Sequence, residues 1–393
     1  MAALDSYHHG VRVVEEDGGT RPIRTIETAV IGLVATADDA DSDYFPLNTP
    51  KLIAGDTASI GKAGTTGTLA RVLSAIFDQG RAMIVVVRVA EDADPAIQTS
   101  NVIGGYDANG DASGISALAA AKQVVGLTPR VWGAPGLDNQ AVTTELVAKA
   151  KQQRSMVYAR AEGNTKEDVV TYRNNFGDRE LMLIWPDFNV WNTATSSNDT
   201  LESAAVALGH RAKMDYEYGW HKTISNIPVQ GVTGVSKSIS WRLQEMTTDA
   251  GYLNTNEITT LVNEQGFRFW GSRTCSSDPL FSFESATRTA QILADTMAEA
   301  HLWAVDKPMH ASIVKDIIES VNAKLRDLTR NGYLIGGSCW FDPEINTETT
   351  LSDGKLRIDY DYTPVPPIED LTFIQRITDS YWMQFTQAVI SGS

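Results

Sequence analysis

The sequence is poor in three features that mark common classes of protein: cysteine, excess positive charge and long apolar runs. Its 393 residues hold two cysteines, Cys275 and Cys339, which excludes a small secreted fold held together by several disulfides. The formal net charge is −16, whereas a protein that binds duplex nucleic acid needs a basic surface. We therefore expect no direct contact with nucleic acid.

No stretch of the chain is apolar over the roughly 20 residues that cross a bilayer. The most apolar strand-like run, AMIVVVRVA, is short and carries Arg88. The opening sequence, MAALDSYHHG, lacks the basic and apolar regions of a secretion signal. These absences predict a protein that is made in the cytoplasm and has no membrane partner.

Two motifs suggest chemistry but fail on spacing. His8 and His9 are adjacent, so in a strand they point to opposite faces, and the sequence around them supplies no further metal ligands. The run GDTASIGKAGTTG resembles a phosphate-binding loop, but Gly55 and Gly61 are one residue too far apart and Ala63 replaces the required hydroxyl. We interpret the first motif as a solvated or interface pair and the second as a glycine-rich turn before a helix.

The sequence also lacks the usual signatures of nucleophilic catalysis. The motif G-x-S-x-G is absent, and we interpret the two cysteines as buried thiols rather than nucleophiles. We expect His301, which is next to Leu302 and Trp303, to be a core or interface histidine. We predict no catalytic residue, no metal and no cofactor, so a structural or assembly protein is the leading interpretation.

Apolar runs and amphipathic stretches alternate through the first two thirds of the chain. Strands are expected in TIETAVIGLVAT, AMIVVVRVAE, PRVWGAPG, SMVYARAE and RELMLIWPDF, with helical patterns between them. Such alternation of continuous apolar strands with helices predicts an α/β fold with a mainly parallel sheet covered by helices. We place this domain at residues 26–272 and expect a β-rich excursion inside it, in NIPVQGVTGVSKSISWRLQ.

The pattern changes after GFRFWGSRTCSSDP. Two long helices are expected, one in LFSFESATRTAQILADTMAEAHLWAV and one that begins at Pro308 and ends at Asn331 and Gly332. The runs GYLIGGSCWFDPE and GKLRIDYDYTPVPPIEDLTFIQRIT supply strands. We predict an α+β C-terminal domain at residues 273–378.

Both ends of the chain have strand-like sequences with no hairpin partner beside them, which predicts N- and C-terminal β-arms at residues 1–25 and 379–393. An isolated strand must find a sheet edge or stay in water, and a strand that pairs with another copy gains main-chain hydrogen bonds. The alternative, that both ends pack on their own chain or fray, stays open. The residues that we expect to make contacts between subunits are Val11, Val13, Val14, Tyr381, Trp382 and Phe385.

Four stretches together resemble the sheath proteins of contractile phage tails, above all the short P2-like sheaths and the R-type bacteriocin sheaths. They are SYHHGVRVVEEDGGTRPIRTIETAVIGLVATA, YRNNFGDRELMLIWPDF, GFRFWGSRTCSSDP and DYTPVPPIEDLTF, and the most specific part runs from Phe267 to Cys275. The resemblance spans nearly the whole chain. It implies a subtilisin-like α/β domain with no recognisable catalytic triad, and a role that is not enzymatic.

The resemblance also implies a mechanism and partners. Six copies form a ring around a tail tube, the rings stack into a helical cylinder, and baseplate and tail terminator proteins are further partners. Arms at both ends pair with strands in the C-terminal domains of neighbours. When triggered, the sheath shortens and widens, and it drives the tube through the target envelope. Such a subunit is made in the cytoplasm of a bacterial host and becomes part of a virion tail or a tail-like particle.

A contact with the tube must be releasable, which favours charged over apolar surface. The charged side of the helix expected at residues 309–330 is our candidate, although an ordinary solvated face explains the same pattern. Its tube-facing candidates are Lys315, Lys324 and Arg326. Two other functions stay open: a sheath component of a type VI secretion-like apparatus, and a nucleotide- or cofactor-using α/β enzyme with its ligand at the carboxyl edge of the sheet.

Overall fold

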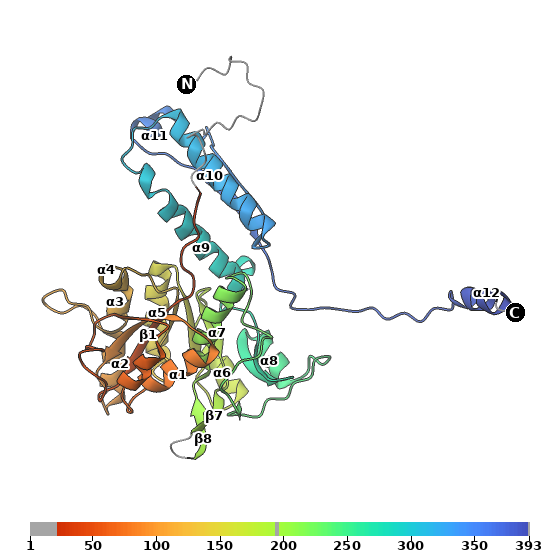
Figure 1. The fold of residues 1–393 in the computed structure, drawn as a ribbon, viewed down its shortest axis with the longest axis horizontal. Helices are drawn as coiled ribbons and strands as arrows, with labels where there is room; N and C mark the ends of the chain where they lie inside the picture. The colour runs from red at the N-terminus through yellow and green to blue at the C-terminus, as the bar shows by residue number, and fades with distance from the viewer. Residues whose placement is uncertain (1–21, 193–195, 392–393) are drawn as a thin grey trace, which may run out of the picture.

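The computed structural model describes residues 22–192 and 196–391 of the chain. Figure 1 shows three parts: an α/β body, a narrower unit of helices and strands above it, and an extended segment that leads away from both. We call residues 30–283 the central body, residues 284–364 the C-terminal unit and residues 365–391 the C-terminal segment.

The central body is built on an eight-stranded sheet with the order β11-β10-β6-β5-β4-β1-β3-β2. Its six inner strands run parallel, and the two edge strands, β2 and β11, are antiparallel to their neighbours. The prediction of a mainly parallel sheet is confirmed. The strands are β1 Val30–Thr36, β2 Lys51–Ala54, β3 Met83–Val89, β4 Val131–Gly133, β5 Met156–Arg160, β6 Leu181–Ile184, β10 Ile258–Asn263 and β11 Phe267–Trp270.

Helices cover both faces of this sheet, which is why its inner strands are continuous apolar runs rather than alternating ones. One face packs against α1 Leu69–Gln79 and α7 Ser203–Glu217. The helices on the other face are α2 Pro95–Ile103, α3 Gly114–Ala119, α4 Ala121–Val125, α5 Gln140–Gln153, α6 Lys166–Arg173 and α8 Asp249–Thr255. The short 3-10 helix η1, Thr57–Lys62, precedes α1.

A second, three-stranded sheet extends from the lower end of the body. It consists of β7 Phe188–Asn192, β8 Ser197–Leu201 and β9 Gly234–Val235. The β-rich excursion predicted at residues 226–244 is therefore wrong in its extent. That stretch contributes two residues of strand, and most of it is irregular because its side chains and backbone bond to the edge of the main sheet instead, as Val229 N–H does to Phe267 O.

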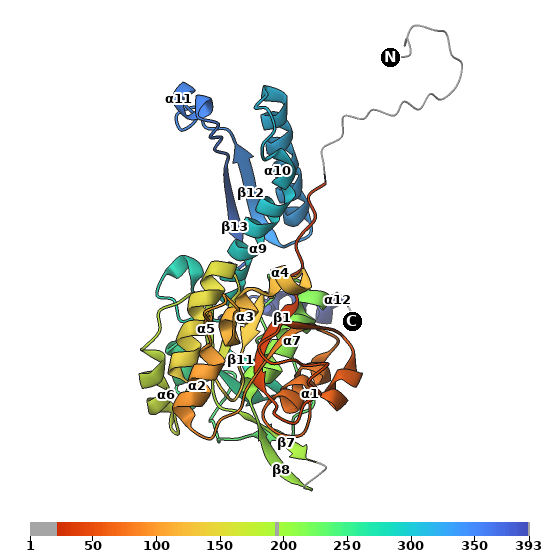
Figure 2. The same cartoon turned by 90° about the vertical axis from the view of Figure 1, so that its left-hand side faces the viewer.

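The C-terminal unit pairs two helices with a two-stranded sheet (Figure 2). Its elements are α9 Glu284–Ala300, η3 Leu302–Ala304, α10 Ala311–Arg330, β12 Leu334–Trp340, α11 Glu348–Ser352 and β13 Asp359–Pro364. The apolar stripe of α10, with Val321 and Leu325 at its centre, packs with Leu293 of α9 and Leu334 of β12. The predicted helix is present but begins at Ala311, three residues later than expected.

Residues 273–283, at the start of the predicted C-terminal domain, contact the central body. Cys275 is buried in the core on one face of the main sheet, and its N–H donates to Leu181 O. The short helix η2, Pro279–Phe281, lies in this stretch. The chain crosses to the C-terminal unit at the start of α9.

The last part of the chain differs most from the prediction. Residues 365–378 have no regular secondary structure and residues 379–381 form a bend and turn. Residues 382–391, which lie in the β-arm predicted at 379–393, form the helix α12 Trp382–Ser391. A strand needs a partner for its backbone, whereas a helix pairs its N–H and C=O groups within itself. A segment that lies apart from its own chain's sheets therefore satisfies its backbone as a helix. Among the described residues no helix is both long and apolar enough to span a bilayer.

Candidate functional site: open strand edges and exposed chain ends

The glycine-rich loop before α1 is closed by the chain's own carboxylate. Asp39, which follows β1, accepts hydrogen bonds from the N–H groups of Thr65 (2.8 Å) and Thr66 (3.0 Å) and from both of their hydroxyls. These bonds hold the pKa of Asp39 well below its usual value. A Cβ on Gly64, whose φ is +76°, would lie 2.2 Å from the Asp39 Oδ1 atom. The N–H groups of Thr65 and Thr66 are therefore already bonded to a carboxylate of the same chain.

Internal polar contacts also occupy the carboxyl edge of the parallel sheet, where an α/β enzyme would bind its ligand. The strand order reverses at β1, which lies between β3 and β4. Near this point Arg71 of α1 pairs with Glu202, whose Oε1 atom lies beside Gly136. Asp138 is 1% exposed and accepts a 2.7 Å hydrogen bond from the Arg160 N–H. These internal contacts give the enzyme interpretation no support.

The two cysteines, His210 and His301 occupy structural positions. Burial raises the pKa of Cys275 to about 12 and that of Cys339 to about 11, so neither thiol is activated. Burial lowers the pKa of His210 to about 3. The His301 Nδ1 atom lies 2.7 Å from Met297 O. In the part of the chain that the structure describes, no three His, Cys, Asp or Glu side chains form a group that could hold a metal ion.

The two-stranded sheet of the C-terminal unit has outer edges on both sides in the described chain. One side is partly closed, because the Asn322 side chain of α10 donates to Cys339 O and accepts from Cys339 N–H, both at 2.8 Å. The Cys339 backbone therefore faces away from β13. Opposite residues of an antiparallel ladder alternate in direction, so Tyr360, opposite Cys339, and Tyr362 turn their backbone groups to the outer edge of β13. That edge can accept another strand.

The C-terminal segment exposes an unusual amount of apolar side chain. Every residue from Ile368 to Ser391 is exposed, and Ile377 reaches 99%. Large exposed apolar surfaces mark interaction sites. The residues are Ile368, Leu371, Phe373, Ile374, Ile377, Tyr381, Trp382, Met383, Phe385, Val389 and Ile390. Tyr381, Trp382 and Phe385, predicted to contact a neighbour, lie at the start of α12, with the Trp382 and Phe385 rings 5.6 Å apart.

The described N-terminal residues run along the C-terminal unit down to the body (Figure 2). Thr25 Oγ1 accepts a 2.8 Å hydrogen bond from Lys324 Nζ of α10, and Thr28 O accepts one from Arg288 of α9. Residues 22–26 and the end of α9 line a groove of about 390 Å³. The predicted arm residues Val11, Val13 and Val14, and the pair His8 and His9, lie outside the described residues.

The tube-facing candidates occupy two kinds of environment. Lys315 and Arg326 are exposed on α10. Lys324 is half-buried and donates to Thr25, and burial lowers its pKa. Of the three candidates, Lys324 thus also helps to hold the described N-terminal residues, whereas Lys315 and Arg326 lie exposed on the helix.

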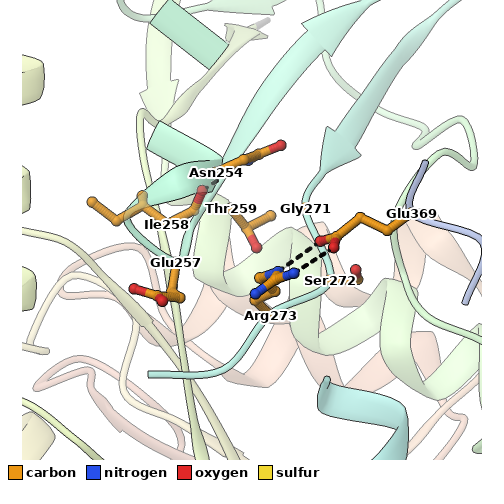
Figure 3. Close-up of a pocket in the computed structure, with 8 residues that line it drawn as sticks. All are labelled: Asn254, Glu257, Ile258, Thr259, Gly271, Ser272, Arg273 and Glu369. Carbon is orange, nitrogen blue, oxygen red and sulfur yellow. Dashed lines mark hydrogen bonds and ion pairs between the residues drawn. The ribbon is translucent and has the colours of Figure 1, made fainter. Parts of the chain in front are cut away.

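An ion pair ties the root of the C-terminal segment to the central body (Figure 3). Arg273 donates from Nε to Glu369 Oε1 at 2.8 Å and from Nη2 to Oε2 at 2.6 Å. The Arg273 guanidinium lies 5.4 Å from the centre of the Phe283 ring. The residues that line this shallow recess are Asn254, Glu257, Ile258, Thr259, Gly271, Ser272, Arg273 and Glu369. Arg273 lies in the most specific part of the sheath-like sequence, but its partner could not be predicted.

A polar stripe on α9 joins the C-terminal unit to the body, and sequence reasoning missed it. Every third or fourth residue of the helix pairs with the body: Glu284 with Arg211 and Tyr158, Arg288 with Asp215, Gln291 with Ser155 O, Asp295 with Arg130 and Arg154, and Glu299 with Lys122. The first four of these α9 side chains are buried. The spacing E-x3-R-x2-Q-x3-D-x3-E was the signal available in the sequence.

Three family models match consecutive parts of the chain. The phage tail sheath protein central domain matches residues 110–275, and the phage tail sheath C-terminal domain matches residues 276–378. The tail sheath protein Gp18 domain III N-terminal region matches residues 28–89.

Curated proteins match over almost the whole length. The chain is 52% identical to the tail sheath protein of Escherichia phage P2, over 99% of this chain and 100% of that one. It is 47% identical to the major tail sheath protein of Serratia phage KSP20, over 96% of this chain and 97% of the other.

Solved structures share the fold at low sequence identity. The anti-feeding prophage helical sheath in its contracted state has a TM-score of 0.70 at 19% identity, over 95% of this chain and 99% of that one. The PVC sheath complex of an extracellular contractile injection system, also contracted, has a TM-score of 0.71 at 15% identity, over 95% and 98%.

Proposed function

The chain belongs to the phage tail sheath family and is a structural subunit of a contractile tail sheath, not an enzyme, and we propose that strands exchanged between copies hold that sheath together. Each copy donates its C-terminal segment to the outer edge of β13 in a neighbour, and its N-terminal arm pairs with a further neighbour. The observation that carries this proposal is an open strand edge and an exposed apolar segment in the same chain.

The part of the C-terminal segment best suited to form the donated strand precedes α12. Leu371, Phe373 and Ile377 recur with the two-residue period of a strand, so their side chains would share one face. All three are exposed in the single chain. Beyond them, Tyr381, Trp382 and Phe385 would pack on the neighbouring copy.

The acceptor site supplies backbone pairing on one side and a helical layer beneath. Tyr360 and Tyr362 present backbone groups at the β13 edge, while α9 and α10 pack with these strands in one core. An added strand gains main-chain hydrogen bonds there, and its alternate side chains extend the apolar layer. The N-terminal arm, with Val11, Val13 and Val14, would extend a neighbouring sheet in the same way.

The complete assembly contains stacked hexameric rings around a tail tube, with baseplate and tail terminator proteins as further partners. Lys315 and Arg326 are the side chains that would face the tube, with Lys324 as a third candidate that also holds Thr25. Contraction of the rings drives the tube through the target envelope. The subunit is made in the bacterial host cytoplasm. A subtilisin-like fold for the central body stays a prediction.

The relatives favour a phage-type sheath over the two other functions that the sequence left open. The proteins at 52% and 47% identity are tail sheath proteins of phages. A type VI-like sheath component and a nucleotide-using enzyme are therefore not favoured.

Electron microscopy of the purified chain at high concentration tests the proposed assembly. We expect long hollow cylinders, because donor and acceptor are present in each copy. A chain that lacks residues 365–393 is the control and should stay dispersed. Monodisperse monomers or dimers of the full chain, or normal cylinders of the shortened one, would contradict strand exchange by the C-terminal segment.

A further inference from the structure

The donor and acceptor of the proposed exchange are neighbours in the same chain, which raises the question of why a copy does not pair with itself. β13 ends at Pro364, and the strand-like run begins at Leu371. A hairpin that turned within residues 365–370 would lay that run on the outer edge of its own β13. Groups joined by a short linker meet at millimolar effective concentration, so self-pairing would compete strongly with a second copy. This question rests on the proposed function above.

The sequence between the two strands resists such a turn. Pro364, Pro366 and Pro367 stand in the run TPVPPIED. Proline fixes φ near −65°, whereas tight hairpin turns need positive φ, and a proline restricts the residue before it to extended conformations. Proline-rich linkers are extended and semi-rigid. The chain therefore leaves β13 in a straight path.

A second, independent contact holds the linker away from β13. Glu369 is bound through both carboxylate oxygens by Arg273, at 2.8 and 2.6 Å, on the central body (Figure 3). Arg273 is itself placed by its backbone bridge to Phe283 and by the Phe283 ring. A return hairpin would place Glu369 in the turn or beside β13, and the two hydrogen bonds that hold Glu369 on Arg273 oppose that rearrangement. Figure 1 shows the segment leading away from the chain's own sheet.

We propose that Pro366, Pro367 and the Arg273–Glu369 ion pair prevent the C-terminal segment from closing its own β13 edge and so direct it to a second copy. The two devices differ in kind. The prolines disfavour the turn permanently. The ion pair is partly exposed, with both side chains at 39%, so it holds the root of the segment in a direction but can open when a neighbour moves.

The test compares hydrogen exchange in the dilute, unassembled chain with the rate of cylinder formation. The main variant combines Pro366→Asn, Pro367→Gly and Glu369→Gln, which supplies a favourable hairpin turn and removes the ion pair. Asp370→Asn is the matched control, because it removes a neighbouring carboxylate from the same linker. A second pair, Arg273→Glu and Glu369→Arg, is made singly and together.

We expect exchange at residues 359–364 to slow by about tenfold in the triple variant, because a self-paired strand protects the β13 edge. Cylinder formation should slow by a similar factor, and Asp370→Asn should behave like the unchanged chain. Each charge reversal alone should slow assembly, and the double reversal should restore it.

Unchanged exchange and unchanged assembly in the triple variant would overturn the proposal, as would a double reversal no better than either single one. Failure of the proposed function looks different. In that case the chain that lacks residues 365–393 would form normal cylinders. Hydrogen exchange at β13 in the triple variant would still show whether the linker prevents self-pairing.

Discussion

Asp138 is a buried carboxyl at the carboxyl edge of the main sheet, and it costs the fold stability at neutral pH. Burial raises its pKa to about 6 from the usual 3.8, against the Arg160 N–H bond that lowers it. The folded chain therefore keeps a proton on Asp138 that the unfolded chain has already lost above about pH 4. The free energy of unfolding therefore falls as the pH rises from about 4 to 6, because the buried carboxylate becomes charged. Above that range it stays at the lower value.

Asp138→Asn should remove this pH dependence, because the amide cannot ionise. We expect the stability of the variant relative to the unchanged chain to rise between about pH 4 and pH 6 and then stay level, by up to about 3 kcal/mol. Urea unfolding at a series of pH values measures it. A constant difference from pH 4 to pH 8 would show that Asp138 does not titrate in this range.

Single residues also show what a sequence can and cannot reveal about a site. The spacing of Gly55, Gly61 and Ala63 was enough to reject a phosphate loop, but it could not show that Asp39 closes the turn. Arg273 could be placed in a family-specific stretch, whereas its partner Glu369 lies 96 residues away. Contacts between distant residues depend on the tertiary fold, which local patterns do not encode.

The element that joins the two halves of the molecule is α9, and its joint is made of charge rather than apolar surface. The buried groups balance, since the guanidinium groups of Arg130, Arg211 and Arg288 meet the carboxylates of Glu284, Asp295 and Asp215, three of each sign. Buried ion pairs add little stability over apolar contacts, but a shifted register would leave charges unpaired. The joint thus fixes α9 in one register on the body.

Two carboxylates on this same stripe of α9 should differ sharply in their contribution to stability. Asp295→Ala leaves the buried Arg130 without its carboxylate, so we expect a loss of about 3–5 kcal/mol in the free energy of unfolding. Glu299→Ala, which removes the exposed pair with Lys122, should cost less than about 1 kcal/mol. Guanidinium unfolding of both variants measures the difference, and equal losses would contradict a charge-paired joint.

At this scale the sequence predicts elements well where both faces are buried and poorly where a partner is missing. β1 and β3 were recognisable because two-sided burial makes them continuous apolar runs. The stripe of α10 was recognisable from its helical spacing. The segment of α12 reads as a strand from its β-branched and aromatic residues, yet it is helical in the single chain because no sheet edge pairs with it. The structure of this segment in the assembly depends on a neighbouring chain as well as on its own sequence.

At the scale of the whole molecule, we expect the energy of contraction to be stored in the packing of copies. Burial of ~100 Å² more apolar surface per subunit would release about 2.5 kcal/mol. Over many copies this becomes a large sum, before opposing entropy and desolvation are subtracted. Packed interfaces are bistable rather than continuously deformable, so we expect the change to run along the whole cylinder.

The N-terminal arm is tested by deleting residues 1–20. The three core clusters of the described chain begin at Ile23, so the shortened subunit should fold and unfold at nearly the same temperature. It should form no stable cylinders in the electron microscope, because one of its strand exchanges is lost. A chain whose first 20 residues are replaced by glycine and serine of equal length is the control, and it should fail in the same way. Normal cylinders formed by either variant would show that the N-terminal arm is not needed for assembly.

A cryo-electron microscopy reconstruction of the assembled cylinder would show the strand exchange itself. We expect a backbone from a second copy beside the outer edge of β13, hydrogen-bonded at Tyr360 and Tyr362, with Arg273 and Glu369 at the root of the donated segment. A reconstruction in which both chain ends return to their own subunit, and the β13 edge faces solvent, would contradict it.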